Sequence, residues 1–88
     1  MKYQWDKTKA TSNLKKHGIE FADAVSVFSD ELAITIPENR FDEERFVTIG
    51  TDVFGRILVI VFTWRSEDIR LISARLAERR EGKQYEED

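Results

Sequence analysis

The feature that most constrains the fold of this chain is an uninterrupted apolar run, Ile57 to Phe62, with a β-rich segment close on either side. The three segments are "ERFVTIG" (44–50), "RILVIVFT" (56–63) and "IRLIS" (69–73). Their β-branched and aromatic residues favour strands. The connections "TDVFG" and "WRSED" are too short for a crossover, so we expect antiparallel neighbours. The apolar run is also far too short to span a bilayer.

Two helices are predicted before these strands. Asp6 is a good N-cap for a helix that continues to Lys16 or His17. Cations in its last turn precede Gly18, which can adopt a positive φ and end the helix. The apolar residues from Phe21 to Phe28 follow helical spacing, which predicts a second helix from about residue 20 to 28.

The remaining segments complete a single α+β domain over residues 1–88. Residues 32–36 are predicted to form a strand that ends at Pro37, followed by a polar loop over 38–43. Residues 3–5 can add an edge strand, helix-forming residues return over 74–80, and 81–88 form a charged tail. The predicted order is two N-terminal helices, an antiparallel sheet of about four strands, and a short C-terminal helix.

Composition excludes several classes of protein. The 88 residues include no cysteine, which removes disulfides, thiolate metal sites and cysteine nucleophiles, and which fits the cytoplasm. The opening "MKYQWDKTK" lacks the apolar stretch of a signal peptide. The sequence contains no glycine-rich phosphate loop, no His or Cys metal spacing and no Ser-His-Asp set. We therefore expect neither a cofactor nor a metal ion.

The charges are distributed in bands, although their formal sum is −3. Five of the six lysines lie in residues 1–20, and all eight arginines lie between Arg40 and Arg80. Seven acidic residues lie in 21–44, against Arg40 alone. A basic surface can therefore coexist with the acidic total. Ordinary solvated charge is the alternative interpretation.

The two predicted hairpins bring several arginines together. Turns centred near residues 52–53 and near residue 67 place Arg45 opposite about Val61, Val61 opposite about Ser73, and Arg70 opposite about Trp64. This register gathers Arg45, Arg65, Arg70 and Ser73 at one end of the sheet and leaves Arg56 at the other. A shift of one residue would exchange the two faces, so the shared end is the firmer prediction.

A guanidinium group matches the oxygens of phosphate and carboxylate. The shared end therefore predicts a patch that binds or cleaves phosphate esters. The alternative is internal pairing with Glu44, Glu67, Asp68 or Glu78, as surface salt bridges worth roughly 0–1 kcal/mol each. Trp64 adjoins the arginine-containing turn and can stack on a base, whereas the other aromatic residues are expected in the core. The single histidine, His17, suits a structural role in a helix C-terminus.

Taken together, three segments resemble the BrnT family of type II toxin–antitoxin systems, small ribonuclease toxins with a RelE-like fold. The segments are "WDKTKATSNLKKHGIEFADAVSVFSD", "EERFVTIG" and "LVIVFTWRSEDIRLISARLAERREGKQYE". They cover nearly the whole chain in the order expected of the family, and "KHGIEFADAVSVF" and "RLISAR" are the more specific parts. The turn over residues 66–68 and the neighbouring Trp64 are less typical.

The resemblance implies a cytoplasmic endoribonuclease that arrests growth by cutting RNA. It also implies a cognate BrnA-like antitoxin with a ribbon-helix-helix DNA-binding domain, through which the complex reaches operator DNA, and no membrane partner. The residues to which we assign catalytic roles are Glu44, Arg45, Arg65, Arg70 and Arg75. The residues assigned to substrate binding are Lys15, Lys16, Ser73, Trp64 and Tyr85. Each of these except Trp64 also matches the family pattern.

Metal-free RNA cleavage needs a base, cations for the phosphate transition state, and an acid. Arginine supplies only the cations, because its pKa above about 12 bars it from proton transfer. The base and acid must then come from Glu44, Glu81, Tyr85, His17 or a lysine, so catalysis should depend mainly on positioning and charge. The rival hypothesis is a non-catalytic regulatory module that acts with a DNA-binding partner in autorepression.

Overall fold

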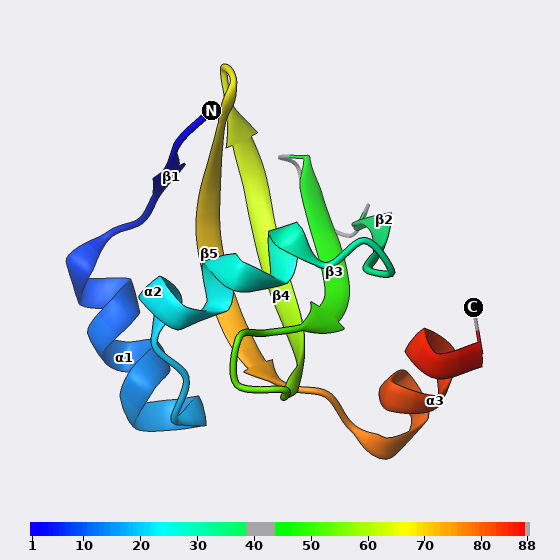
Figure 1. Ribbon diagram of the computed structural model, residues 1–88. Coiled ribbons are helices and arrows are strands. Elements are labelled where there is room, and N and C mark those ends of the chain that lie inside the picture. Colours follow the sequence, from blue (N-terminus) through cyan, green and yellow to red (C-terminus); the bar gives the residue numbers. More distant parts are fainter. Residues whose placement is uncertain (39–43, 88) are drawn as a thin grey trace.

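A five-stranded sheet forms the centre of the computed structural model, which describes residues 1–38 and 44–87 (Figure 1). The strands are β1 (Tyr3–Gln4), β2 (Ile34–Glu38), β3 (Arg45–Thr51), β4 (Ile57–Arg65) and β5 (Asp68–Leu76), in the order β1-β5-β4-β3-β2. The helices are α1 (Lys7–His17), α2 (Phe21–Ala24), the 3₁₀ helix η1 (Val25–Ser29) and α3 (Arg79–Glu87). The predicted α+β class is confirmed.

The sheet is mixed, whereas an antiparallel sheet of about four strands was predicted. The strands β2 to β5 are antiparallel neighbours, as expected. The short strand β1 joins as a fifth, parallel strand, pairing Tyr3 with Ile69 and Gln4 with Arg70. The predicted edge strand at residues 3–5 therefore exists, and it lies against β5.

Helix α1 begins and ends as its capping residues predict. The Asp6 carboxylate accepts hydrogen bonds from the backbone N–H groups of Thr8 and Lys9, at 2.7 and 3.3 Å. At the other end Gly18 adopts a φ of 73°, and its N–H donates to the Leu14 carbonyl at 2.8 Å. The prediction of a helix that is capped by Asp6 and continues to Lys16 or His17 is confirmed.

The second predicted helix is shorter than expected. Only α2 is α-helical, and the chain tightens into η1 from Val25 onward. The Ser26 hydroxyl donates to the Asp23 carbonyl at 2.7 Å, which offers that carbonyl a partner other than the α-helical one. The tighter turn places Val27, which is fully buried, against β3.

Two predicted boundaries along the sheet were wrong. Strand β2 continues through Pro37 to Glu38, because β2 is an edge strand and tolerates a residue without an N–H donor. Of the predicted loop over residues 38–43, Glu38 thus belongs to β2, and 39–43 lie outside the described residues. Glu44, predicted as the first residue of a strand, directly precedes β3 instead.

The predicted C-terminal helix exists, but its predicted bounds, residues 74–80, were wrong. Strand β5 continues to Leu76, with Ala74 opposite Ile60 and Leu76 opposite Leu58. This pairing outweighs the helical propensity of the segment, because Ala74 is fully buried in the core. Helix α3 begins instead at Arg79 and includes residues 81–87, which were predicted to form a charged tail.

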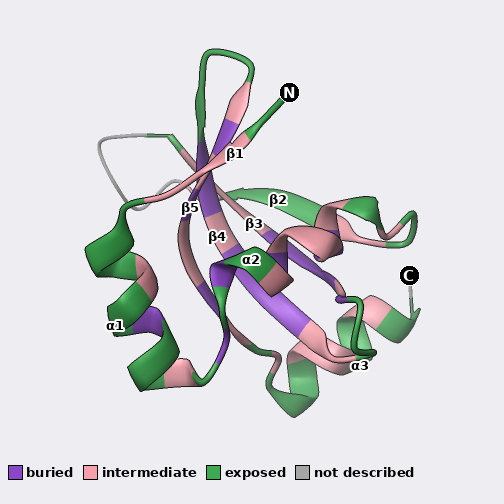
Figure 2. Ribbon diagram, turned by 60° about the vertical axis from the view of Figure 1, so that its left-hand side comes forward, coloured by how far each residue is buried: buried purple, intermediate pink, exposed green. Residues whose placement is uncertain are grey.

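One face of the sheet carries the core beneath α1, α2 and η1 (Figures 1 and 2). The core residues are Ile19, Phe21, Ala24, Val27, Leu58, Ile60, Phe62, Ile69, Leu71 and Ala74. Phe28 meets Phe62 edge-on, with ring centroids 5.1 Å apart. We call this the helical face. No helix among the described residues has the length and apolar character to cross a membrane.

The opposite side, which we call the second face, carries the alternate residues of each strand. Helix α3 lies against one end of it. There the Tyr85 hydroxyl contacts the Thr51 hydroxyl, Gly82 lies near Ile57, and Glu81 pairs with Arg75. The other end, toward the β4–β5 hairpin, has no helix over it in Figure 1.

Candidate active site

A row of polar residues crosses the second face near the β4–β5 hairpin. Thr63 lies opposite Arg70, Arg70 lies beside Gln4 on β1, and Arg45 lies opposite Glu38 on β2. Arg45 directly precedes the Phe46–Phe62 pair, so it lies beside Thr63. At 4.7–4.9 Å between strands, the backbones of Arg45 and Arg70 are roughly 10 Å apart, with Thr63 between them.

Arg65 completes this group, two residues beyond Thr63 on the same face of β4. We call Arg45, Arg65 and Arg70 the arginine cluster. Asp68, directly opposite Arg65, accepts hydrogen bonds from the Lys2 backbone N–H at 3.0 Å and from Gln4 Nε2 at 3.3 Å. Across the described part of the chain, no carboxylate forms an ion pair with the exposed Arg65.

The predicted gathering of arginines at one end is supported, although two of the predicted pairs were wrong. Arg45 lies beside Thr63 rather than opposite Val61, because the β3–β4 turn spans residues 52–56. The pairing of Val61 with Ser73 is confirmed. A bulge after Val61 then shifts the register by one, so that Arg70 lies opposite Thr63 instead of Trp64.

The side chain of Gln4 orients Arg70. Its Oε1 accepts a hydrogen bond from Arg70 Nη1 at 3.4 Å, while its Nε2 donates to Asp68. Thr63, which is buried with an exposed fraction of 9%, donates from its hydroxyl to the Glu44 carbonyl at 2.7 Å and so fixes the start of β3. Sequence reasoning missed both Gln4 and Thr63, because their roles depend on the register of β1 and of the bulge.

Burial changes along the second face. Toward α3, Ile49 and Val59 are buried, with exposed fractions of 5% and 2%. Toward the hairpin, Val47, Val61 and Arg70 are only half-buried. The accessible part of the second face is therefore the part that carries the arginine cluster.

Arg75 lies on the second face but is separate from the cluster. It is five residues from Arg70 along β5, roughly 16 Å at ~3.3 Å per residue. Its guanidinium donates to both carboxylate oxygens of Glu81, each at 2.8 Å. The hydrogen bond from Arg75 lowers the pKa of Glu81, and the same bond raises the pKa of Arg75. The alternative of internal pairing thus holds for Arg75, with Glu81 as its partner.

Tyr85 lies at the far end of the second face and does not join the arginine cluster. Its hydroxyl donates to Asp30 Oδ2 at 2.6 Å and accepts from the Thr51 hydroxyl at 3.0 Å. The hydrogen bond to Asp30 raises the pKa of Tyr85. Thr51 is six residues from Arg45 on β3, which amounts to roughly 20 Å. Tyr85 therefore anchors α3 to the sheet.

The other predicted residues lie in three places. Trp64 packs edge-on against Phe62 on the helical face, opposite the arginine cluster, and is 46% exposed. Glu44 is exposed directly before Arg45, at the arginine end of the sheet. Lys16 and Ser73 line one hollow between α1 and β5, and Lys15 does not line it. Arg56 lies at the opposite end, as predicted, paired with Asp52 at 2.7 Å.

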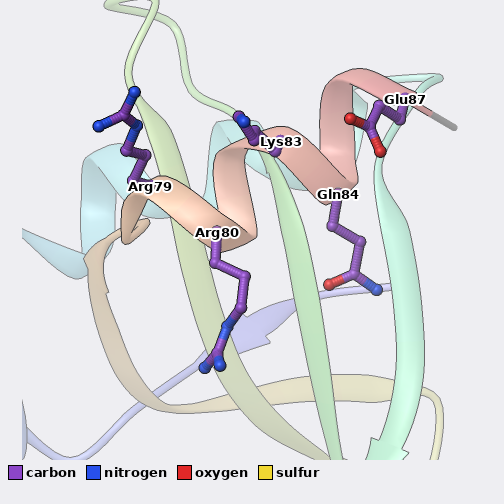
Figure 3. A pocket seen from close by; sticks show the side chains of 5 residues that line it. All are labelled: Arg79, Arg80, Lys83, Gln84 and Glu87. Atoms are coloured by element: carbon purple, nitrogen blue, oxygen red, sulfur yellow. The ribbon is translucent and has the colours of Figure 1, made fainter.

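A larger hollow, of about 610 Å³, borders α3. Its described lining residues are Arg79, Arg80, Lys83, Gln84 and Glu87, all from that one helix (Figure 3). Because no second element of the described chain contributes to it, we assign it no role. Nowhere in residues 1–38 and 44–87 do three or more His, Cys, Asp or Glu residues gather closely enough to hold a metal ion.

Fold and site together define a small α+β domain that presents clustered guanidinium groups on the accessible end of a sheet. A surface of this kind is typical of proteins that bind phosphate or carboxylate groups. Residues 5–81 match the family model described as "Ribonuclease toxin, BrnT, of type II toxin-antitoxin system". The chain belongs to this family of ribonuclease toxins, and a toxin of type II implies an antitoxin partner.

A solved structure supports this family membership. The chain is similar to the Brucella abortus ribonuclease toxin BrnT, whose crystal structure was solved at 1.1 Å resolution. The two chains are 32% identical, with 90% of this chain and 99% of the Brucella chain covered, and the TM-score is 0.71. The comparison with curated proteins finds no match.

Proposed function

We propose that the arginine cluster is the site at which this chain binds and cleaves an RNA phosphodiester, and that it does so without a metal ion. The observation that carries the proposal is the strand register, which places the backbones of three arginines around Thr63 on the accessible end of the second face. Arg65 supports it most directly, because its charge is not neutralised by an ion pair within the described residues.

The chemistry that fits this site is attack of the ribose 2′-oxygen on the adjacent phosphorus. The P–O2′ bond forms, the P–O5′ bond breaks, and the products are a 2′,3′-cyclic phosphate and a free 5′-hydroxyl. Guanidinium donors stabilise the charge that develops on the phosphoryl oxygens in the transition state. They cannot transfer the two protons themselves.

Glu44 is our candidate for the base that takes the 2′-hydroxyl proton. It lies at the arginine end, and its backbone is fixed by the hydrogen bond from Thr63. Glu81 is committed to Arg75 and Tyr85 to Asp30, so neither serves as a proton carrier at the cluster. In this scheme the leaving 5′-oxygen takes its proton from water. General acid–base catalysis typically contributes ~10²–10⁴-fold to the rate. Because this scheme uses water and no protein side chain as the acid, we expect a slow enzyme.

We further propose that the partner is a cognate BrnA-like antitoxin with a ribbon-helix-helix domain, and that the complex binds operator DNA through that antitoxin. Neutralisation then follows if the antitoxin covers the arginine cluster, since the cluster is the accessible end of the sheet. The cytoplasm is the expected location, because the proposed RNA substrate and operator DNA are found there. These assignments rest on the family to which the chain belongs.

The test is cleavage of a defined RNA by the purified chain in the presence of EDTA. We expect fragments that end in a 2′,3′-cyclic phosphate, and we expect the antitoxin to stop their formation. Absence of cleavage, or cleavage only after a divalent ion is added, would contradict the proposal. Expression of the chain without its antitoxin in cells distinguishes the ribonuclease from the rival regulatory module, because a regulatory module would not arrest growth.

A further inference from the structure

A second cationic site lies between α1 and the outer edge of β5. It is an open hollow of about 270 Å³. Its lining residues are Thr8, Lys9, Ser12, Asn13, Lys16, His17, Ile72 and Ser73. None of these described residues is acidic. The side chains of these residues carry two ammonium groups, an imidazole and three hydroxyl groups.

The two lysines face the hollow because of their spacing. Lys9 and Lys16 are seven residues apart, which is close to two turns of α-helix, so they lie on the same side of α1. Lys7 and Lys15 are on the same helix but do not line the hollow. The helix thus offers two lysines inside the hollow and two outside it, at nearly the same height.

The floor of the hollow is rigid. The Asn13 side chain is buried and takes the place of a neighbouring strand for β5: its Nδ2 donates to the Ala74 carbonyl at 2.8 Å, and its Oδ1 accepts from the Ala74 N–H at 3.0 Å. Nδ2 also donates to the Ile19 carbonyl at 2.9 Å. These three bonds hold α1 at a fixed distance from β5.

Ser73 connects this hollow with the arginine cluster. It lines the hollow, and it also lies on the second face opposite Val61. Arg70 is three residues away along β5, roughly 10 Å at ~3.3 Å per residue. A flexible anionic chain lying across Arg70 can therefore pass over Ser73 and reach Lys9 and Lys16.

We propose that the hollow between α1 and β5 binds a second phosphate of the RNA strand whose scissile phosphate lies on the arginine cluster, with Lys9 and Lys16 as its cationic ligands. This inference rests on the proposed function and adds the path of the substrate around the edge of β5. Solvent-exposed ammonium groups bind phosphate through screened charge, so the contribution should fall as salt rises.

The experiment measures binding of a non-cleavable 2′-O-methyl RNA of about ten nucleotides, a length within the range of single-strand binding sites. Fluorescence anisotropy over a series of NaCl concentrations compares two double variants, Lys9→Gln/Lys16→Gln and Lys7→Gln/Lys15→Gln. Both remove two charges from the same helix, so the general electrostatic field changes equally. Circular dichroism confirms that both variants are folded.

For the Lys9→Gln/Lys16→Gln variant we expect about tenfold weaker binding. The slope of log K against log[salt] should become shallower by about 0.7, because this variant neutralises one phosphate fewer than the wild-type chain. The Lys7→Gln/Lys15→Gln variant should retain most of the affinity, because neither Lys7 nor Lys15 lines the hollow. The same measurement tests the substrate-binding role that was predicted for Lys15 from the sequence.

Equal losses of affinity in the two variants would overturn the inference, since the lysines would then act only through the overall field. Unchanged RNA binding with weaker antitoxin binding would also overturn it and assign the hollow to the partner. If the wild-type chain cleaves RNA in either case, the proposed function stands. If the wild-type chain neither binds nor cleaves RNA, both are wrong.

Discussion

Arg75 and Glu81 form a bidentate ion pair that ties β5 to α3, with both nitrogen–oxygen distances at 2.8 Å. Glu81 Oε1 also accepts the Glu78 backbone N–H at 2.8 Å, just before α3 begins. Helix α3 contains no buried residue, so this pair and the Tyr85 hydroxyl are its main polar anchors among the described residues. Arg75 accordingly helps to hold α3 against the sheet.

Glu81→Gln should lower the free energy of unfolding by about 0.5–1 kcal/mol at pH 7, because the pair is partly exposed to solvent. The folded state lowers the pKa of Glu81. The stabilisation is therefore present above the ordinary glutamate pKa of about 4.3 and is lost as pH falls through the lower folded value. Urea denaturation of the wild-type chain and of the Glu81→Gln variant, at pH 7 and in acid, measures this difference in the free energy of unfolding.

Glu86→Gln on the exposed side of α3 is the matched control and should change stability little at either pH. A difference between wild type and Glu81→Gln that persists unchanged in strong acid would show that the pair does not stabilise the fold through its charge.

Asn13→Ala should destabilise the protein by about 2–4 kcal/mol, because it leaves the N–H and carbonyl of Ala74 buried without partners. Ser12→Ala, on the same helix, removes a hydroxyl group that forms none of these bonds and should stay within about 0.5 kcal/mol of wild type. Thermal unfolding of the two variants makes the comparison. Similar melting temperatures would mean that Asn13 does not stabilise the edge of β5.

Gly50→Ala and Gly82→Ala should have opposite effects on stability. A Cβ at Gly50 would lie 2.8 Å from Val27 Cγ1 and 3.0 Å from Ala33 Cβ, so the overpacking should cost about 1–3 kcal/mol. A Cβ at Gly82 meets only Ile57 Cδ1 at 4.0 Å, and alanine within a helix should gain about 0.5–1 kcal/mol. Chemical denaturation tests both. Destabilisation by Gly82→Ala would contradict the placement of α3.

Gln4→Ala should reduce RNA cleavage through Arg70, because the guanidinium loses the carbonyl that orients it. We expect kcat to fall about fivefold, equivalent to about 1 kcal/mol, with a smaller change in KM. Gln84→Ala, on the exposed part of α3, is the control. A positioning role predicts this fall even in a Gln4→Ala protein that is fully folded at the assay temperature; an unchanged kcat would remove Gln4 from the site.

Local signals in the sequence predicted the parts of the fold that local physics determines. Helix α1 follows from Asp6 and Gly18, and the antiparallel order of β3 to β5 follows from short connections. The limits of β5 were not predictable in this way, because Ala74 favours helix by propensity and becomes strand through its pairing with Ile60.

For the candidate site, the sequence predicted only that the arginines lie at the same end of the sheet. Hairpin lengths brought Arg65 and Arg70 together, but the bulge after Val61 changes which residue faces which, and no local signal marks it. The pairing of Arg75 with Glu81 depends on where α3 turns back, which is a tertiary property. Gln4 reaches Arg70 only because β1 returns to lie beside β5.

The most direct measurement is the rate of RNA cleavage by Arg65→Ala and Arg70→Ala, with Arg79→Ala on α3 as the control and with melting temperatures recorded for all three. We predict that each cluster variant loses about 10²–10³ in kcat/KM while its melting temperature stays close to wild type, and that Arg79→Ala keeps its activity. Full cleavage activity in a folded Arg65→Ala or Arg70→Ala protein would contradict the assignment of the arginine cluster as the catalytic site.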